Sequence, residues 1–365
     1  MIANVSYLVI VFSALSFFTD TPELRLFGDG NTWQSIVGAS VLLWVVHFLV
    51  LRGVQTAAGI NLVATLAKLL PLGAFVALAA LAFQLDTFRL DFSGLALGVP
   101  VWEQVKNTML ITLWVFIGVE GAVVVSARAR HKRDVGRATL LAVLSALAVY
   151  LLVTLLSLGV VPRSELAEMR NPSMAGLMVR LMGSWGEIVI AAGLIVSVCG
   201  AYLSWTIMAA EVPFLAATHK AFPRLFARQN SNNAPSASLW LTNISVQVSL
   251  VLIWLTGSDY GTLLTIASEM ILVPYLLVGA FLLKIATRPL HKAVAIGACI
   301  YGIWLLYASG PVHLLLSVVL YAPGLLVFLY ARRTHQHDRS LKRREVALIG
   351  LLLVAAVPAT WMLVG

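Results

Sequence analysis

The feature that most constrains this chain is a series of long apolar segments that recurs from one end to the other. A helix needs about 20 mostly apolar residues to cross the hydrocarbon core of a bilayer. The segments are apolar all round, whereas the strands of a membrane barrel alternate apolar and polar residues over about ten positions. We count about eleven segments, at roughly 1–18, 33–51, 56–83, 104–127, 137–160, 186–216, 236–256, 260–283, 292–309, 311–331 and 346–364. The sequence therefore predicts an all-α polytopic membrane protein, with residues 1–365 forming a single transmembrane domain.

Composition excludes an ordinary water-soluble domain. Hydrophobic residues make up 60% of the chain and charged residues 11%, whereas soluble domains have roughly 45–50% and 25%. Cys199 and Cys299 both lie in apolar runs, so the sequence offers neither a disulfide framework nor a Cys-x-x-Cys metal site. No basic region or small-residue cleavage site follows Met1, and we therefore expect no signal peptide.

The formal charge of +9 follows a pattern along the chain. Alternate connectors hold 18 of the 25 Lys and Arg residues, and most acidic residues lie in the opposite connectors. Connectors rich in Lys and Arg face the cytoplasm, so the pattern predicts a cytoplasmic N-terminus and, after an odd number of crossings, a C-terminus outside. We interpret the basic runs at 131–134 and 332–344 as ordinary cytoplasmic anchors rather than patches for lipid head groups or nucleic acid. We therefore expect the lipid bilayer as a partner of this protein, and no nucleic acid.

Ionisable residues inside the apolar segments are the first candidates for a functional site. Such a residue at membrane depth costs at least about 2.5–3.5 kcal/mol on insertion scales, and it usually has a role. Lys68, Glu120 and Glu269 lie within segments, and Glu211 lies near the end of one, where a structural contact explains it equally well. For Lys68 the structural alternative is a carbonyl freed by Pro71, and for Glu269 it is pairing with another buried group.

Glu120 has the richest context, because Gly118 and Gly121 flank it in mid-segment. Glycine in a helix interior costs about 1 kcal/mol relative to alanine, and two so close together predict local unwinding. Unwound turns expose carbonyl and N–H groups, which is how broken helices bind zwitterionic substrates in transporters. Close helix packing through the two glycines is the alternative. Trp114, six residues before Glu120, offers a ring face for a cation.

Signatures of enzymes are missing from the sequence. Only His47 of the seven histidines lies well within an apolar segment, so paired haem ligands are absent. The chain also lacks an HExxH motif, a Walker A loop, GxGxxG and GxSxG. We therefore predict no catalytic site, no cofactor and no metal, which argues against an ATP-driven pump or an oxidoreductase. A channel is harder to exclude, although no filter-like loop repeats.

A resemblance to a known family extends over essentially the whole chain. Residues 107–120 resemble the sixth transmembrane helix of the basic amino acid/polyamine antiporters, which belong to the amino acid–polyamine–organocation (APC) superfamily; they read NTMLITLWVFIGVE. The likeness continues in the same order with the basic loop that follows, then with Leu-Ser-Trp-Thr at 203–206, and then with Met-Ile-Leu-Val-Pro-Tyr at 270–275. Arginine/ornithine antiporters are the most similar members. The resemblance implies two inverted five-helix repeats with further C-terminal helices, and exchange of cationic amino acids across the bacterial inner membrane.

Matched in order, segment 104–127 is the family's sixth helix and 1–18 its third. The family's first two helices then have no counterpart, and the third begins at its middle, so we expect an N-terminally truncated member. In the family, the first helix carries a Gly-Ser-Gly-type break that binds the substrate carboxylate. Three explanations of the truncation stay open: a misassigned start, a truncated gene, or a chain that was shortened deliberately. We expect transport by this chain alone to be impaired.

The resemblance implies a substrate-binding role for five residues. Trp114 would stack on the side chain of a bound basic amino acid. The carbonyls of Trp114 and Ile117, next to Gly118, would accept hydrogen bonds from its α-ammonium. Asn4 matches the position that contacts the guanidinium, and Trp205 matches a distal aromatic gate.

Other residues are assigned roles in coupling and gating by the same resemblance. Glu120 resembles a glutamate that helps to govern gating in proton-sensitive members, and Tyr275 belongs to the aromatic gate layer. Lys68 resembles the lysine that replaces a sodium ion in sodium-independent members. Glu269 stands where agmatine-exchanging relatives are apolar, and Tyr7 stands where some relatives have Met.

Two alternatives to arginine/ornithine exchange stay open. One is a proton-coupled permease for lysine or another basic amino acid, with Glu120 as the proton site. The other is a membrane fragment that does not transport. A small-molecule substrate is the expected partner in both transport hypotheses, and a homodimer is left open.

Overall fold

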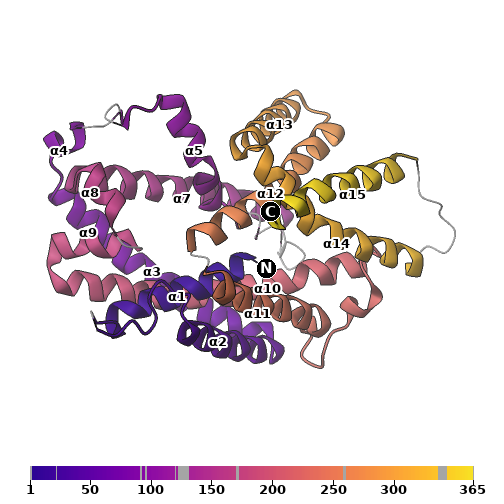
Figure 1. Cartoon of the computed structure of the whole chain (residues 1–365), viewed down its shortest axis with the longest axis horizontal. Coiled ribbons are helices and arrows are strands. Elements are labelled where there is room, and N and C mark those ends of the chain that lie inside the picture. Colours follow the sequence, from indigo (N-terminus) through magenta and orange to yellow (C-terminus); the bar gives the residue numbers. More distant parts are fainter. Residues whose placement is uncertain are drawn as a thin grey trace. The chain divides into compact units, whose positions relative to one another are not determined.

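The computed structural model is built from helices connected by short turns (Figure 1). The residues that it describes are 2–21, 23–90, 93–94, 97–119, 121, 131–169, 172–257, 260–335 and 343–364, and no strand occurs among them. This confirms the all-α fold class.

Each predicted apolar segment coincides with a helix over most of its length, except 104–127, of which α5 covers 104–114. These helices are α1 (Ile2–Thr19), α2 (Trp33–Leu51), α3 (Val54–Leu81), α5 (Val101–Trp114), α7 (Lys132–Val160), α10 (Ser184–Thr218), α11 (Ser236–Thr256), α12 (Tyr260–Ile285), α13 (Pro289–Ser309), α14 (Pro311–His335) and α15 (Arg343–Val364). In the described part of the chain, six helices are long and apolar enough to cross a membrane. The count of eleven crossings stays a prediction.

Short helices occupy connectors for which the sequence predicted no element. They are α4 (Leu85–Arg89), α8 (Arg163–Glu168), α9 (Ser173–Met182) and the 3-10 helix η3 (Arg224–Ala227). The helix α9 is too short to cross a bilayer, but its Leu177 and Met178 are buried together with Phe75 of α3. Its ordering therefore comes from tertiary packing, which a search for membrane-length segments does not detect.

The chain divides into two compact units. The first unit comprises Met1–Val101, Gly118–Val212 and Arg228–Leu263, and the second comprises Trp102–Ile117, Pro213–Ala227 and Leu264–Gly365. Each unit has its own apolar core.

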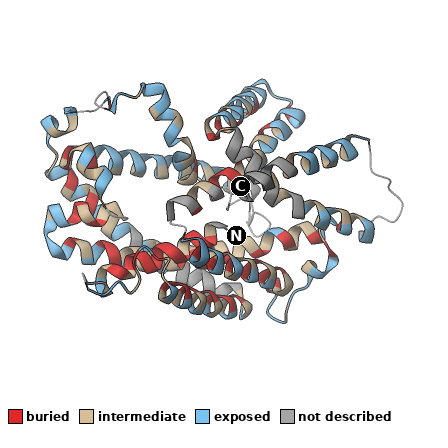
Figure 2. Cartoon of the chain, viewed as in Figure 1, coloured by how far each residue is buried: buried red, intermediate tan, exposed pale blue. Residues whose placement is uncertain are grey.

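The core of the first unit surrounds α1. This helix contacts α2 and α11, and it is buried over most of its length (Figures 1 and 2). Gly38 of α2 allows the close approach, because a Cβ atom there would lie 2.3 Å from Cε1 of Phe12. The buried cluster includes Val5 and Leu8 of α1 and Leu43 of α2. The buried α1 is thus the element against which α2 and α11 pack.

A polar seam joins α2 to α11. The indole Nε1 of Trp44 donates to Oε1 of Gln247 over 3.1 Å, and the Gln247 amide donates to Oγ of Ser40 over 2.8 Å. His47 is fully buried, and its Nδ1 lies 2.9 Å from the Asn243 amide nitrogen. The one histidine well inside an apolar segment therefore has a helix-packing role.

The outward face of α2 is apolar. Val37, Val41, Val45 and Phe48 are each more than half exposed and recur every three or four residues along the helix. Keeping such side chains in water would forgo about 1.5–3 kcal/mol each relative to burial. Lipid is the solvent that suits this face, as expected of a multi-pass membrane protein.

Asp20 organises the connector between α1 and α2. Its two carboxylate oxygens accept hydrogen bonds from the backbone N–H of Phe27 (3.0 Å) and of Gly28 (2.7 Å), and Thr19 donates its hydroxyl over 3.1 Å. Burial raises the pKa of Asp20, but these hydrogen bonds favour the ionised form and leave the pKa below its ordinary value of 3.8. The ionised carboxylate thus stabilises the connector.

We predict that Asp20→Ala lowers the free energy of unfolding by about 1–2 kcal/mol, because backbone donors lose a charged acceptor. An acid whose pKa is lower in the folded state stabilises the fold at pH values above its ordinary pKa. The contribution of Asp20 is therefore lost as pH falls from 3.8 through the lowered pKa. Unfolding of the detergent-solubilised protein, followed by circular dichroism, measures both effects.

Asp29→Ala is the matched control, because Asp29 forms an exposed ion pair with Arg25 in the same connector. Exposed pairs contribute about 0–1 kcal/mol, so this variant should change stability less. Equal losses in the two variants would contradict the role given to Asp20.

Candidate functional site at a helix break

The helix α5 stops in the middle of its apolar segment. It ends at Trp114, and residues 115–119 form turns. The N–H groups of Phe116 and Ile117 donate to carbonyls three residues back, those of Leu113 and Trp114, each over 3.1 Å. Gly118 has a φ of 110°, which favours glycine over other residues. The unwinding predicted from Gly118 and Gly121 is confirmed.

Trp205 of α10 lies directly against the break. A Cβ atom on Gly118 would be only 2.7 Å from Cζ2 of Trp205. One turn further along α10, Met208 approaches Gly121, where a Cβ atom would lie 3.0 Å from its Cε. The two glycines therefore allow close helix packing as well as local unwinding. Both interpretations of this sequence pattern, unwinding and packing, apply.

Two residues of α1 complete this group. Asn4 is 1% exposed, and its Nδ2 donates to Oγ1 of Thr206 over 3.4 Å. The Thr206 hydroxyl in turn donates to the carbonyl of Tyr202 over 2.8 Å. Tyr7 lies one turn after Asn4, and its ring centroid is 6.3 Å from that of Trp205 at a tilt of 36°.

Asn4, Gly118 and Trp205, all expected from the sequence to bind substrate, thus come together within the first unit. The contribution of Thr206 was missed. The signal for it was a hydroxyl next to Trp205 in a largely apolar helix, but one sequence does not show that its partner lies more than 200 residues away.

The chemistry of this group suits a cationic ligand. Trp205 and Tyr7 present aromatic faces, which attract cations through the negative potential of the ring. Nδ2 of Asn4 donates to Thr206, and the amide oxygen is the atom of this side chain that can accept from a donor.

The other expected site residues of known placement belong to the second unit. Tyr275 of α12 packs against a core formed by Leu113, Leu272 and Leu305. Glu269 of the same helix is 5% exposed. Trp114 and Ile117 are half-buried at the break. Their grouping around a shared ligand stays a prediction.

The carbonyl that Pro274 frees in α12 has a specific hydrogen-bond partner. Pro274 has no N–H, so the carbonyl of Met270, four residues earlier, loses its helical donor. The hydroxyl of Tyr321 on α14 donates to this carbonyl over 2.7 Å. A neighbouring helix therefore satisfies the polar group that proline frees next to Glu269, as lipid-embedded helices require.

Two further expected residues are not settled by the structure. Glu120 lies outside the described residues, and Lys68 lies in α3 but its side chain is outside the described part. The gating role of Glu120 and the sodium-replacing role of Lys68 stay predictions.

Known proteins were compared with the chain as a whole. Residues 1–352 match a protein-family model described as amino acid permease. The chain is 87% identical over its full length to an Escherichia coli K12 protein provisionally named an arginine/ornithine antiporter, of which it covers 79%. It is 43% identical to an arginine/ornithine antiporter of Pseudomonas aeruginosa, with 91% of this chain and 72% of the relative aligned. It is also 38% identical to an arginine/agmatine antiporter of Chlamydia caviae, with 98% and 77% aligned.

We predict that Gly118→Ala destabilises the protein by about 2–3 kcal/mol, because the new methyl group collides with Trp205 while the backbone is held at positive φ. Gly183→Ala is the matched control: its φ of 71° is also positive, but nothing lies within 4 Å of the added Cβ. It should cost about 1 kcal/mol. Unfolding in detergent gives both values.

A double variant separates the collision from backbone strain. Trp205→Leu should recover part of the stability lost in Gly118→Ala, because it removes the colliding ring. A loss in Gly118→Ala no larger than in Gly183→Ala would show that Trp205 does not pack on the break.

Proposed function

The chain belongs to the amino acid permease family, and we propose that it exchanges cationic amino acids across the bacterial inner membrane, arginine against ornithine. The observation that carries this proposal is the group formed by Asn4, Tyr7 and Trp205 at the Gly118 break. Relatives that align over most of the chain are named for antiport of arginine with ornithine or agmatine. Membership of a permease family also agrees with the expectation that the chain is not an enzyme.

Recognition of the substrate side chain is proposed to rest on aromatic faces and amide oxygen. A guanidinium is planar and weakly hydrated, so it stacks on aromatic rings as well as donating hydrogen bonds. We assign stacking to Trp114 and Trp205, and acceptance of a guanidinium N–H to Asn4. The α-ammonium would be bound by the carbonyls of Trp114 and Ile117, beside Gly118. Tyr7 contacts Trp205 and would extend the aromatic surface of the proposed site.

Exchange rather than net flux follows from the cost of an empty site. Buried carbonyls and amides without a partner cost free energy, so a carrier that closes around them unliganded reorients slowly. A bound cationic amino acid satisfies these groups and allows reorientation. Each inward movement of one substrate is then coupled to an outward movement of another.

We propose coupling roles for residues whose neighbours are less completely described. Glu120 would respond to protons during gating, and Tyr275 would contribute to the aromatic gate layer. Lys68 would supply the positive charge that a sodium ion supplies elsewhere. The buried carboxyl of Glu269 would favour a dicationic substrate such as ornithine.

We propose that residues 1–365 form a single transporter domain, with about eleven transmembrane helices that belong to a five-plus-five inverted-repeat fold. The distribution of Lys and Arg supports a cytoplasmic N-terminus and a periplasmic C-terminus. A homodimer stays a prediction.

Counterflow in proteoliposomes tests the function. We expect labelled arginine to enter vesicles preloaded with ornithine, and to enter empty vesicles far more slowly. The chain is assayed beside a version extended at its N-terminus by the two helices that the family has before this point. Uptake into empty vesicles driven by a pH gradient would instead support a proton-coupled permease for basic amino acids. No uptake by either version would leave the chain a membrane fragment without transport.

Substitution of Trp205 tests the site. We predict that Trp205→Leu slows arginine counterflow at low substrate concentration about tenfold, because losing a desolvated cation–π contact costs about 1–2 kcal/mol. Trp185→Leu on the same helix is the control, since Trp185 is 72% exposed at the start of α10, and its rate should stay within about twofold. Equal rates in both variants would remove Trp205 from the substrate site.

A further inference from the structure

Thr206 of α10 joins two helices at the candidate site. Its hydroxyl donates to the carbonyl of Tyr202, four residues earlier, over 2.8 Å. The same hydroxyl accepts a hydrogen bond from Nδ2 of Asn4 on α1 over 3.4 Å. All three residues are at most 1% exposed. Thr206 therefore has one buried bond within its own helix and one buried bond to another helix.

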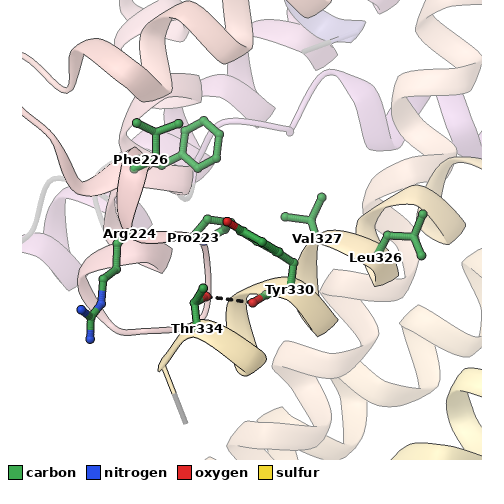
Figure 3. A pocket seen from close by; sticks show the side chains of 8 residues that line it. Pro223, Arg224, Phe226, Leu326, Val327, Tyr330 and Thr334 are labelled. Carbon is green, nitrogen blue, oxygen red and sulfur yellow. Dashed lines mark hydrogen bonds between the residues drawn. The ribbon is translucent and has the colours of Figure 1, made fainter. Parts of the chain in front are cut away.

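The bond within the helix is ordinary for threonine. Helical Ser and Thr side chains bond in this way to a carbonyl of the preceding turn. Thr334 of α14 does so in the second unit, where its hydroxyl donates to the Tyr330 carbonyl over 2.8 Å (Figure 3). Thr334 is exposed beside an apolar hollow, whereas Thr206 is buried and receives an amide donor from α1. The bond from Asn4 is thus the feature of Thr206 that needs an explanation.

The Thr206 hydroxyl decides which way round the Asn4 amide lies. A hydroxyl has one hydrogen to donate and two lone pairs that accept. The hydrogen of Thr206 is used on the Tyr202 carbonyl, so Thr206 can only accept from Asn4. An Asn side chain presents NH2 at one corner and oxygen at the other, and the hydrogen-bond network determines which corner faces a neighbour. Thr206 therefore requires the nitrogen of Asn4, and the amide oxygen is held at the other corner.

We propose that Thr206 is a positioning residue that makes the site selective for side chains that only donate hydrogen bonds. It acts through Asn4, by preventing the amide nitrogen and oxygen from exchanging places. The guanidinium of arginine and the ammonium of ornithine have donors and no acceptor, so a fixed oxygen suits both. Citrulline, an uncharged analogue of arginine, has a carbonyl oxygen in place of one donor group, and the Asn4 oxygen cannot bind it. This inference rests on the proposed function, because it takes Asn4 as a ligand of the substrate.

A purely structural role for Thr206 makes a different prediction. The bond between α1 and α10 would then support the site as a whole, and its loss would weaken the binding of every ligand in proportion. Loss of the fixed orientation instead changes the ratio between ligands, because a freed amide can turn its nitrogen toward the oxygen of citrulline. The ratio of the two affinities therefore separates the two roles.

Displacement of labelled arginine from the purified full chain in detergent, by unlabelled arginine, ornithine or citrulline, measures this ratio. We expect the chain to bind both cationic amino acids more tightly than citrulline. Thr206→Val keeps the shape of the side chain without its hydroxyl, and it should lower the preference for arginine over citrulline about tenfold, the equivalent of one hydrogen bond. Thr206→Ser keeps the hydroxyl, and its preference should stay within about twofold.

Three further variants make the test specific. Thr206→Ala removes the same hydroxyl with a smaller side chain and should repeat the result of Thr206→Val. Thr242→Val removes a different buried hydroxyl of the first unit, which donates to the Leu239 carbonyl of its own helix, and should keep the preference. In Asn4→Asp both corners of the side chain are oxygen, so adding Thr206→Val to it should change the ratio less than about twofold.

The outcomes distinguish this inference from the proposed function. An unchanged ratio in Thr206→Val and Thr206→Ala, with arginine still bound, would overturn the role of Thr206 and leave the proposed function standing. An equal fall in Thr242→Val, or a tenfold fall on adding Thr206→Val to Asn4→Asp, would also overturn that role. If the unmodified chain bound neither arginine nor ornithine, the proposed function would be contradicted, and the inference would fail with it.

Discussion

Backbone polar groups without a helical partner are the constraint on which the candidate site depends. Where α5 stops at Trp114, carbonyl and N–H groups leave the regular helical pattern inside a segment that the sequence predicts to lie in the membrane. Such a break persists in a membrane only when protein covers it or a polar cavity surrounds it. The ring of Trp205 over Gly118 provides part of this cover, and a bound zwitterion would provide the rest. The same few backbone atoms therefore affect both the stability of the break and the proposed recognition of the substrate.

The position of α1 explains why the cover can be held in place. Asn4, Ser6, Ser13 and Ser16 of this helix are all buried, which would be costly on a helix facing lipid. Ser16 satisfies its hydroxyl on the carbonyl of Ser13 over 2.6 Å, while Asn4 uses a hydroxyl on α10. Most polar groups at the C-terminal end of α1 thus bond locally, and Asn4 at the other end bonds across to another helix. Asn4 therefore links α1 to α10, as the proposed site requires.

Most of the helices could be predicted from the sequence, because a bilayer imposes a length that apolar runs either reach or miss. The segment 236–256 coincides with α11, and the break at Gly118 followed from the chemistry of glycine. The helix α9 escaped prediction, since its burial depends on α3 rather than on its length. Within the site, Asn4 and Trp205 were expected only through the family resemblance. The contacts of Tyr7 with Trp205 and of Asn4 with Thr206 join residues about 200 positions apart, and spacing along one chain carries no record of them.

The bond from Tyr321 to Met270 has a bearing on how the chain is made. The carbonyl freed by Pro274 of α12 finds its donor on α14, a helix that leaves the ribosome some fifty residues later. Until α14 is in place, the Met270 carbonyl of α12 lacks this donor. It is then either unsatisfied or hydrogen-bonded to a water molecule. The hydrogen bonding of α12 is therefore complete only once α14 has packed beside it, so this helix depends on a later part of the chain for its finished form.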